Sequence, residues 1–193
     1  IPFFLAFEGR RPQARELVVL AVMCALAVAG RVAIPIPSFK AIFGIIMIAG
    51  IAFGPESGFL VGAISALASN FFYSQGPYTP WQMMAYGAGG MLAGFVFAEG
   101  RLPRKPVVMG IFGFLAVAFF VGPLLDTCSV FLVMSRISLK GAMAFYISGF
   151  PVNLRQAVAT AIVLLVLGKP LLEKLDRIKT KYGILDDEGR KEA

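Results

Sequence analysis

Apolar residues fill six stretches of this chain, and short polar or charged segments separate them. The stretches cover about residues 14–33, 39–53, 57–72, 80–98, 107–134 and 142–167. A helix needs about 20 apolar residues to cross a bilayer, so the pattern predicts an all-α integral membrane protein with six transmembrane helices in one domain, residues 1–193. Residues 168–193 carry many charges and are expected to form a solvated cytoplasmic tail.

Two of the predicted helices contain residues that interrupt a regular helix. Gly122-Pro123 lies inside the fifth stretch and Pro151 inside the sixth. Proline lacks a backbone N–H, so kinks are expected at both places.

The composition agrees with a membrane protein and narrows its chemistry. Hydrophobic residues make up 58% of the chain and charged residues 15%, with a mean hydropathy of +0.80, whereas soluble domains carry about 25% charged residues. The chain has no histidine, which excludes histidine-based catalysis, haem ligation and imidazole metal sites. Cys24 and Cys128 lie in apolar stretches without CxxC spacing, so we interpret them as buried small residues. Neither a metal nor a cofactor is expected.

The basic residues predict the orientation of the helices, because Lys and Arg accumulate on the cytoplasmic side of a membrane. With both termini cytoplasmic, that side receives most of them: Arg10, Arg11, Arg15, Arg101, Arg104, Lys105, Lys169, Lys174, Arg177, Lys179, Lys181, Arg190 and Lys191. The other side receives Arg31, Lys40, Arg136 and Lys140, and Arg155 lies within the sixth stretch. Both termini are therefore predicted to be cytoplasmic.

The segment Ser69-Asn-Phe-Phe-Tyr-Ser-Gln-Gly-Pro-Tyr-Thr-Pro-Trp-Gln-Met83 joins the third and fourth stretches. It carries no charge, and it is rich in amide, hydroxyl and aromatic groups. Gln75-Gly76-Pro77 and Thr79-Pro80 predict turns. Aromatic rings beside a few hydrogen-bonding groups suit an uncharged polar ligand on the outer side. An aromatic belt at the membrane interface is the alternative.

Two charged residues lie within predicted spans, where charges are costly unless they are paired or reach water. Asp126 and Arg155 either pair with each other or line a cavity, and we expect both to face the protein interior. Asn153 and Tyr146 precede Arg155 on the same predicted helix. Arg31 and Lys40 flank an outward loop and either ring the mouth of a cavity or reach the interface as snorkelling side chains.

The first predicted helix contains Ala21-x-x-x-Ala25-x-x-x-Ala29. Small residues four apart form a flat face on which another membrane helix can pack closely. The chain contains no G-x-x-x-x-G-K-[ST] run for ATP hydrolysis, no G-x-S-x-G and no H-E-x-x-H. Six spans without inverted repeats also argue against a self-sufficient secondary transporter. A binding subunit that takes its energy from a partner fits these observations better.

Several motifs together resemble the substrate-binding S components of energy-coupling factor (ECF) transporters. They are Phe53-Gly54 to Gly58-Phe59, Ser69-Asn-Phe-Phe72, Gln75-Gly-Pro77, Thr79-Pro-Trp-Gln-Met83, Gly87 and the alanine face. The resemblance covers about residues 15–167, and the run around Trp81 is most similar to the cobalamin-type subgroup. It implies a vitamin-capture subunit of a bacterial plasma membrane. Such a subunit docks through Ala21, Ala25 and Ala29 on a coupling subunit powered by two ATPases and topples to release the vitamin inside.

Cobalamin is the ligand expected from this subgroup, as a transported molecule and not as a cofactor. A corrin needs neutral hydrogen-bonding groups, apolar surfaces and room, which the polar groups of the central stretch, Phe71 and the glycines Gly87, Gly89 and Gly90 would supply. The expected ligand-binding residues are Asn70, Phe72, Tyr73, Gln75, Tyr78, Trp81, Gln82, Tyr86, Asp126, Tyr146, Asn153, Arg155, Arg31 and Lys40. The alternatives are an S component for another vitamin or precursor, an intramembrane enzyme that uses Asp126 with Cys128 or Tyr146, and a structural membrane protein.

Overall fold

The computed structural model describes residues 14–33, 37, 39–97, 100–134, 136 and 138–183. Arg10, Arg11, Arg190 and Lys191, which entered the orientation prediction, lie outside these residues. The described elements are α2 (Ala14–Val32), α3 (Ile42–Phe53), α4 (Pro55–Tyr73), α5 (Thr79–Phe97), α6 (Pro106–Ala116), the π-helical segment η2 (Val117–Val121), α7 (Gly122–Val133) and α8 (Leu139–Tyr182). Over these residues the predicted all-helical fold is confirmed.

Two helical segments are long and apolar enough to cross a membrane. One is the run Pro106–Val133, which consists of α6, η2 and α7 and has 28 residues; the other is α8, with 44 residues. Helix α3 is a shorter apolar helix of 12 residues. Six spans and cytoplasmic termini therefore remain predictions.

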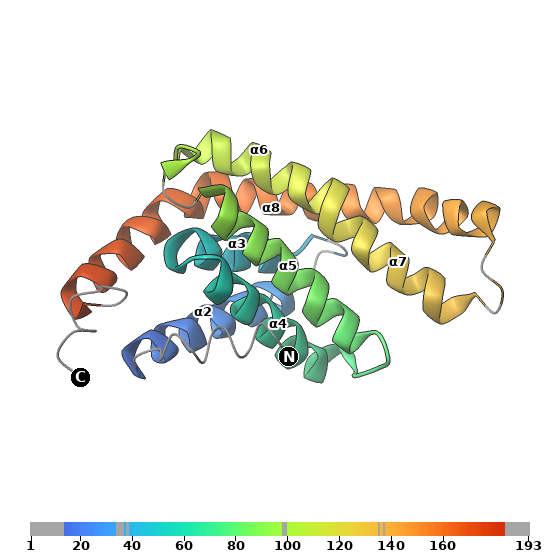
Figure 1. The fold of residues 1–193 in the computed structure, drawn as a ribbon, viewed down its shortest axis with the longest axis horizontal. Helices are drawn as coiled ribbons and strands as arrows, with labels where there is room; N and C mark the ends of the chain where they lie inside the picture. The colour runs from blue at the N-terminus through green and yellow to red at the C-terminus, as the bar shows by residue number, and fades with distance from the viewer. Residues whose placement is uncertain are drawn as a thin grey trace.

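The helices form two groups (Figure 1). Helices α2, α4 and α5 pack around α3, every residue of which is buried. The run from α6 to α7 lies antiparallel to α8. The groups meet where α8 passes α3, because Gly44 leaves room for Val163: a Cβ at Gly44 would lie 2.5 Å from the Val163 side chain. Beyond this crossing, the first half of α8 extends away from α2–α5 (Figure 1).

Glycines allow α3, α4 and α5 to pack with their backbones in contact. A Cβ at Gly58 of α4 would lie 2.5 Å from the carbonyl oxygen of Gly90 in α5 and 2.7 Å from the Cα of Gly50 in α3. Backbone atoms cannot move aside as side chains do, so these contacts require glycine. Close backbone approach gains dispersion contacts between helices in lipid, and it fixes α4 and α5, which carry part of the candidate site, against α3.

The same packing corrects one expectation. Gly87, Gly89 and Gly90 were expected to leave room for a ligand, but neighbouring helices fill that space. A Cβ at Gly87 would lie 2.8 Å from the Phe59 ring, and one at Gly89 would lie 2.9 Å from the Val121 side chain. The small residues serve helix packing instead of a wide ligand cavity.

The expected interruption at Gly122-Pro123 takes the form of a local change of helix type. The wider turns of η2, Val117–Val121, come directly before Gly122 and Pro123. Pro123 cannot donate a backbone hydrogen bond, and a π-helical turn absorbs the break in the hydrogen-bond ladder. The helical run therefore continues from α6 into α7.

The last helix extends farther than the expected residues 142–167. It continues past Pro170 to Tyr182 and ends at Gly183, which has a φ of 59°. Leu172 and Leu175 are 3% and 4% exposed in the core. The structure thus differs from the expected solvated tail over residues 168–183, because the apolar side of this segment packs on the bundle.

Candidate functional site

The turn between α4 and α5 places the polar residues of the central stretch at one end of α2–α5. Helix α4 ends at Tyr73, and Ser74 changes the chain direction with a φ of 80°. The Thr79 N–H donates to the Gly76 carbonyl at 2.9 Å, and the Gly76 N–H donates to Thr79 Oγ1 at 3.2 Å. This closed turn brings the last part of α4 against the first part of α5.

Asn70 is the centre of a polar cluster, which we call the Arg31 cluster: Arg31, Ser69, Asn70, Thr79 and Gln82. The Asn70 side chain is 0% exposed. Its Oδ1 accepts from Arg31 Nη1 at 3.0 Å, and its Nδ2 donates to Thr79 Oγ1 at 3.1 Å and to Gln82 Oε1 at 2.9 Å. Both N–H donors and one lone pair of the amide oxygen connect α2, α4 and α5, so Asn70 positions its neighbours.

Arg31, in the last turn of α2, brings a positive charge to this uncharged stretch. Its Nη1 also donates to the Ser69 hydroxyl. Its guanidinium carbon lies 5.1 Å from the ring centre of Tyr73 and 5.6 Å from that of Tyr86. Within the described residues its partners are hydroxyl, amide and aromatic groups, and none is a carboxylate. The positive charge is therefore held in place without being neutralised.

The tyrosines around Arg31 have different exposures. Tyr86 is 5% exposed and packs edge-on against Phe43, with ring centres 4.6 Å apart. Tyr73 is 45% exposed, and its hydroxyl donates to the Arg31 carbonyl at 3.0 Å. The ammonium of Lys40 lies 6.0 Å from the Tyr73 ring centre. The Tyr73 ring is thus an accessible aromatic surface beside two cations.

Gln75 and Tyr78 stabilise the turn. Gln75 Nε2 donates to the Leu67 carbonyl at 3.1 Å, and its Oε1 accepts from Thr79 Oγ1 at 2.9 Å. The Tyr78 hydroxyl donates to the Ser74 carbonyl at 2.7 Å. Among the polar side chains of this turn, Gln82 keeps a donor, Nε2, that has no hydrogen-bond partner within the described residues.

Trp81 links the α4–α5 turn to α7. Its Nε1–H donates to the Leu124 carbonyl at 2.6 Å, and its ring centre lies 5.9 Å from that of Phe131. The indole is half-buried between the two groups of helices. It therefore lies between the Arg31 cluster and the polar residues of α7 and α8.

A second group, which we call the Asp126 cluster, joins α7 to α8: Asp126, Thr127, Tyr146 and Asn153. Asn153 Nδ2 donates to Asp126 Oδ2 at 2.7 Å, and the Thr127 and Tyr146 hydroxyls lie 2.7 Å apart. Gly149 makes this approach possible, since a Cβ there would lie 2.7 Å from the Asp126 carboxyl carbon. An amide, and not a cation, is thus the described partner of this carboxylate.

Arg155 does not pair with Asp126, and its side chain is exposed instead of facing the interior. Its Nε donates to the Pro151 carbonyl at 3.3 Å, on its own helix. Asn153 and Arg155 are two residues apart and so point to different sides of α8, because successive helical residues are rotated by about 100°. This rotation directs Asn153, and not Arg155, toward α7.

Two aromatic residues proposed for the ligand site point away from both clusters. Phe71 is 75% exposed and Phe72 is 67% exposed. Both lie on the outer side of the last turn of α4, whereas Asn70 lies on the buried side. They fit the interfacial aromatic belt that the sequence left open as an alternative.

The alanine face of α2 is accessible. Ala21, Ala25 and Ala29 are exposed, while Leu20, Met23, Cys24 and Ala27 on the opposite side are buried against the bundle. Within the described residues, the small-residue face is therefore not used for helix packing, and it is accessible to another helix.

Sequence reasoning marked Thr79-Pro80 as a turn signal, but it assigned no contact to Ser69 or Thr79 and did not predict the attachment of Trp81 to α7. Thr79 begins α5 directly before Pro80, and a hydroxyl residue at a helix start is a recognisable signal for turn stabilisation. Trp81 and Leu124 are 43 positions apart in the sequence, and no local sequence pattern predicts their contact.

The amino-acid sequence matches a known protein family. A model of the family described as ECF-type riboflavin transporter, S component, matches residues 12–173. This match supports the S-component resemblance, but it gives no support to the cobalamin-type subgroup. Neither the curated proteins nor the solved structures contain a match.

Proposed function

This chain belongs to the family of S components of ECF-type riboflavin transporters, and we propose that it captures a flavin at the outer side of the membrane for import. It is a membrane transport subunit and not an enzyme, and its family implies association with an ECF module of a coupling subunit and ATPases. The family match over residues 12–173 carries the proposal.

The chemistry of the Arg31 cluster is compatible with riboflavin. A flavin presents a flat ring system, two carbonyl groups at one end and an uncharged chain of hydroxyl groups. The Tyr73 ring and the half-buried Trp81 indole offer surfaces for ring stacking. The Arg31 guanidinium and Gln82 Nε2 are donors suited to carbonyl and hydroxyl oxygens.

The close packing of α3–α5 makes cobalamin a poorer candidate. A corrin is far larger than a flavin and needs a wide opening, whereas Gly87, Gly89 and Gly90 face protein atoms. Small ligands with a few directed polar contacts suit a compact site between packed helices. We therefore infer that the ligand is a flavin.

Equilibrium dialysis of the purified protein against riboflavin and, separately, cobalamin tests this proposal. We expect saturable binding of riboflavin and quenching of Trp81 emission with the same midpoint, because flavin absorption overlaps indole emission. Cobalamin at equal concentration should not compete. Saturable binding of cobalamin without any response to riboflavin would overturn the flavin proposal and would support cobalamin as the ligand.

We further propose that the alanine face of α2 docks on the coupling subunit and that the flavin is released when the subunit topples in the membrane. The exposure of Ala21, Ala25 and Ala29 supports the first step, since no helix among the described residues covers them. The face lies on the opposite side of α2 from the residues packed on the bundle. Docking and ligand binding therefore use different surfaces, and mutations should separate them.

A further inference from the structure

The C-terminal part of α8, residues 168–182, crosses the end of the bundle, and we call it the strap. Toward its end α8 turns away from α6 (Figure 1). Leu172 and Leu175 of the strap are buried, and Ile178 packs partly against the same core. The apolar side of the strap is therefore already covered by this protein.

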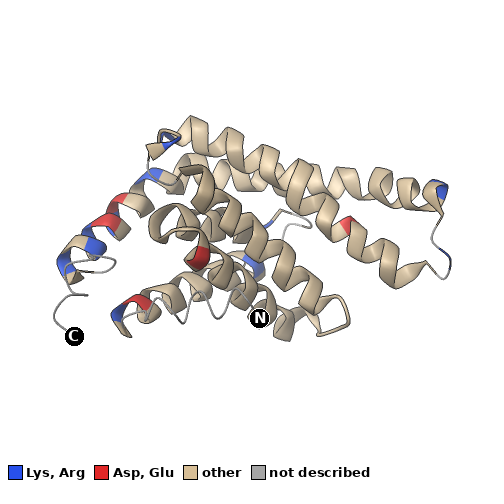
Figure 2. Ribbon diagram, viewed as in Figure 1, with Lys and Arg blue, Asp and Glu red and all other residues tan. Residues whose placement is uncertain are grey.

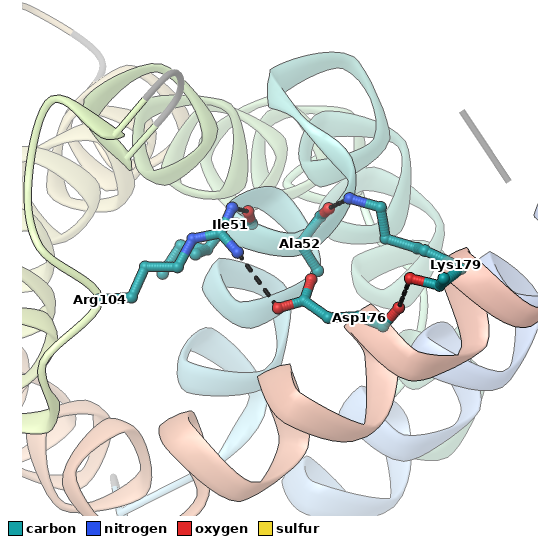
Figure 3. A network of polar contacts seen from close by, with 6 residues as sticks. Ile51, Ala52, Arg104, Asp176 and Lys179 are labelled. Carbon is teal, nitrogen blue, oxygen red and sulfur yellow. Dashed lines mark hydrogen bonds and ion pairs between the residues drawn. The ribbon is translucent and has the colours of Figure 1, made fainter. Parts of the chain in front are cut away.

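Charged contacts attach the strap to the last turn of α3 (Figure 3). Lys179 Nζ donates to the Ala52 carbonyl at 2.7 Å. Arg104, from the segment before α6, donates to the Ile51 carbonyl at 3.1 Å and lies 3.4 Å from the Asp176 carboxylate. Cations at the C-terminal end of a helix satisfy its last carbonyls and its dipole. These contacts hold the strap in one orientation.

That orientation leaves a row of basic residues on the outer side of the strap. Lys169, Lys174, Arg177 and Lys181 are all exposed. Lys169 has a nearby acid, Glu173, at 3.9 Å. Lys174 and Arg177 make no hydrogen bond or ion pair with any part of the chain that the structure describes. Figure 2 shows how Lys and Arg gather at this end of α8.

We propose that this row binds the headgroups of anionic phospholipids in the adjacent leaflet, which the basic-residue distribution predicts to be the cytoplasmic one. The strap directly continues a helix long and apolar enough to cross a membrane. A cluster of Lys and Arg in that position attracts anionic lipids. Because the leucines of the strap are buried in the protein, binding depends on the headgroups and not on insertion of an apolar helix face into acyl chains.

The exposed side of the strap lacks what a protein partner needs. Protein interfaces depend on a few buried aromatic or apolar anchors. Tyr182 is the one large hydrophobic side chain of the strap with high exposure, at 43%, and it lies at the end, beside Arg15 and Lys181. Apart from Pro170, the exposed residues between Lys169 and Lys181 are polar, which favours lipid headgroups over a protein surface.

Native mass spectrometry of the purified full chain tests the proposal, in mixed micelles of phosphatidylglycerol and phosphatidylcholine with identical acyl chains. The wild type should retain phosphatidylglycerol preferentially. Each exposed basic residue of such a cluster contributes about a fivefold preference, so K174Q/R177Q should lower the ratio about twenty-fivefold. The control R136Q/K140Q removes the same number of exposed cations outside the strap. These two cations are not part of a larger basic cluster on one helix, so their loss should lower the ratio clearly less than K174Q/R177Q does.

An equal loss in both double variants or an unchanged lipid ratio in K174Q/R177Q would overturn the proposal. An unchanged ratio can also come with loss of the coupling subunit on co-purification. The last result would assign the row to a protein partner. If K174Q/R177Q does not fold, Lys174→Gln alone removes no described contact and should still lower the ratio about fivefold. Raising the salt from 0.15 M to 1 M should weaken the wild-type preference, because it shortens the screening length.

Discussion

Replacing Asn70 with alanine should destabilise the protein more than any other single amide deletion in the two clusters. The substitution removes a fully buried side chain and its three hydrogen bonds, to Arg31, Thr79 and Gln82. Thr79 retains Gln75 as a partner, while Arg31 and Gln82 are half-buried and regain contact with water only in part. The substitution therefore removes hydrogen bonds that connect three helices, α2, α4 and α5.

The magnitude follows from the number of bonds. A hydrogen bond between membrane helices contributes about 0.6 to 1.7 kcal/mol, so Asn70→Ala should cost about 2 to 5 kcal/mol. Asn153→Ala is the matched control, because Asn153 is also buried, at 5% exposure, but makes one described side-chain bond, to Asp126. Its cost should be about 1 to 2 kcal/mol.

Asn70→Asp separates folding from ligand binding. The new carboxylate can accept from Arg31 as an ion pair, and the Thr79 hydroxyl and the Gln82 amide can both turn to donate to it. Stability should therefore stay closer to the wild type than in Asn70→Ala. Riboflavin affinity should fall at least tenfold, because the Arg31 charge is then neutralised within the protein and is no longer available to the carbonyl groups of the flavin.

Thermal unfolding in detergent and riboflavin dialysis on the same three variants provide the assay. Equal losses of stability in Asn70→Ala and Asn153→Ala would refute the reasoning that the number of buried hydrogen bonds determines the cost. Wild-type riboflavin affinity in Asn70→Asp would refute the role given to the Arg31 charge. The conclusion about stability and the conclusion about riboflavin affinity are therefore tested independently.

Three further predictions follow from packing. Ala25→Trp should abolish riboflavin uptake by the whole transporter, while the isolated subunit should still bind riboflavin. The control Ile111→Trp, on an exposed side of α6, should leave uptake intact. Loss of riboflavin binding in Ala25→Trp would contradict separate surfaces for docking and binding. Gly58→Ala should lower stability by about 1 to 3 kcal/mol, because overpacking strains a close-packed region, and an unchanged melting temperature would count against the backbone contact. Lys179→Ala should cost about 1.5 to 3 kcal/mol, the contribution of a hydrogen bond to a charged group, and speed proteolysis of the strap, while Lys181→Ala should do neither.

The hydrophobic pattern indicated where several helices lie, but not all of their ends. The expected boundaries at 14–33 and 57–72 lie within a few residues of Ala14–Val32 and Pro55–Tyr73, because apolar runs and Gly-Pro turns are local signals. The pattern could not identify the strap. A charged amphipathic segment after a proline reads equally well as a solvated end or as a packed helix, and only the bundle surface determines which one forms.

The candidate site was also only partly predictable from the sequence. Its residue types could be read from the sequence, since Asn70, Trp81, Gln82 and Arg31 were each singled out. Their roles could not: Asn70 connects three helices, and Trp81 is bonded to α7. Such contacts join residues 9 to 43 positions apart, and only helix packing determines them.

Asp126, Arg155 and the glycines of α5 show why tertiary structure was needed. The sequence by itself determined that two charges lie in apolar helices, and that small residues recur near the proposed site. Only the packing decided that Asp126 meets Asn153 while Arg155 turns outward, and that helices fill the space beside Gly87 and Gly90. Side-chain direction depends on helix rotation and on the neighbouring helix, and neither quantity is present in the order of residues along one helix.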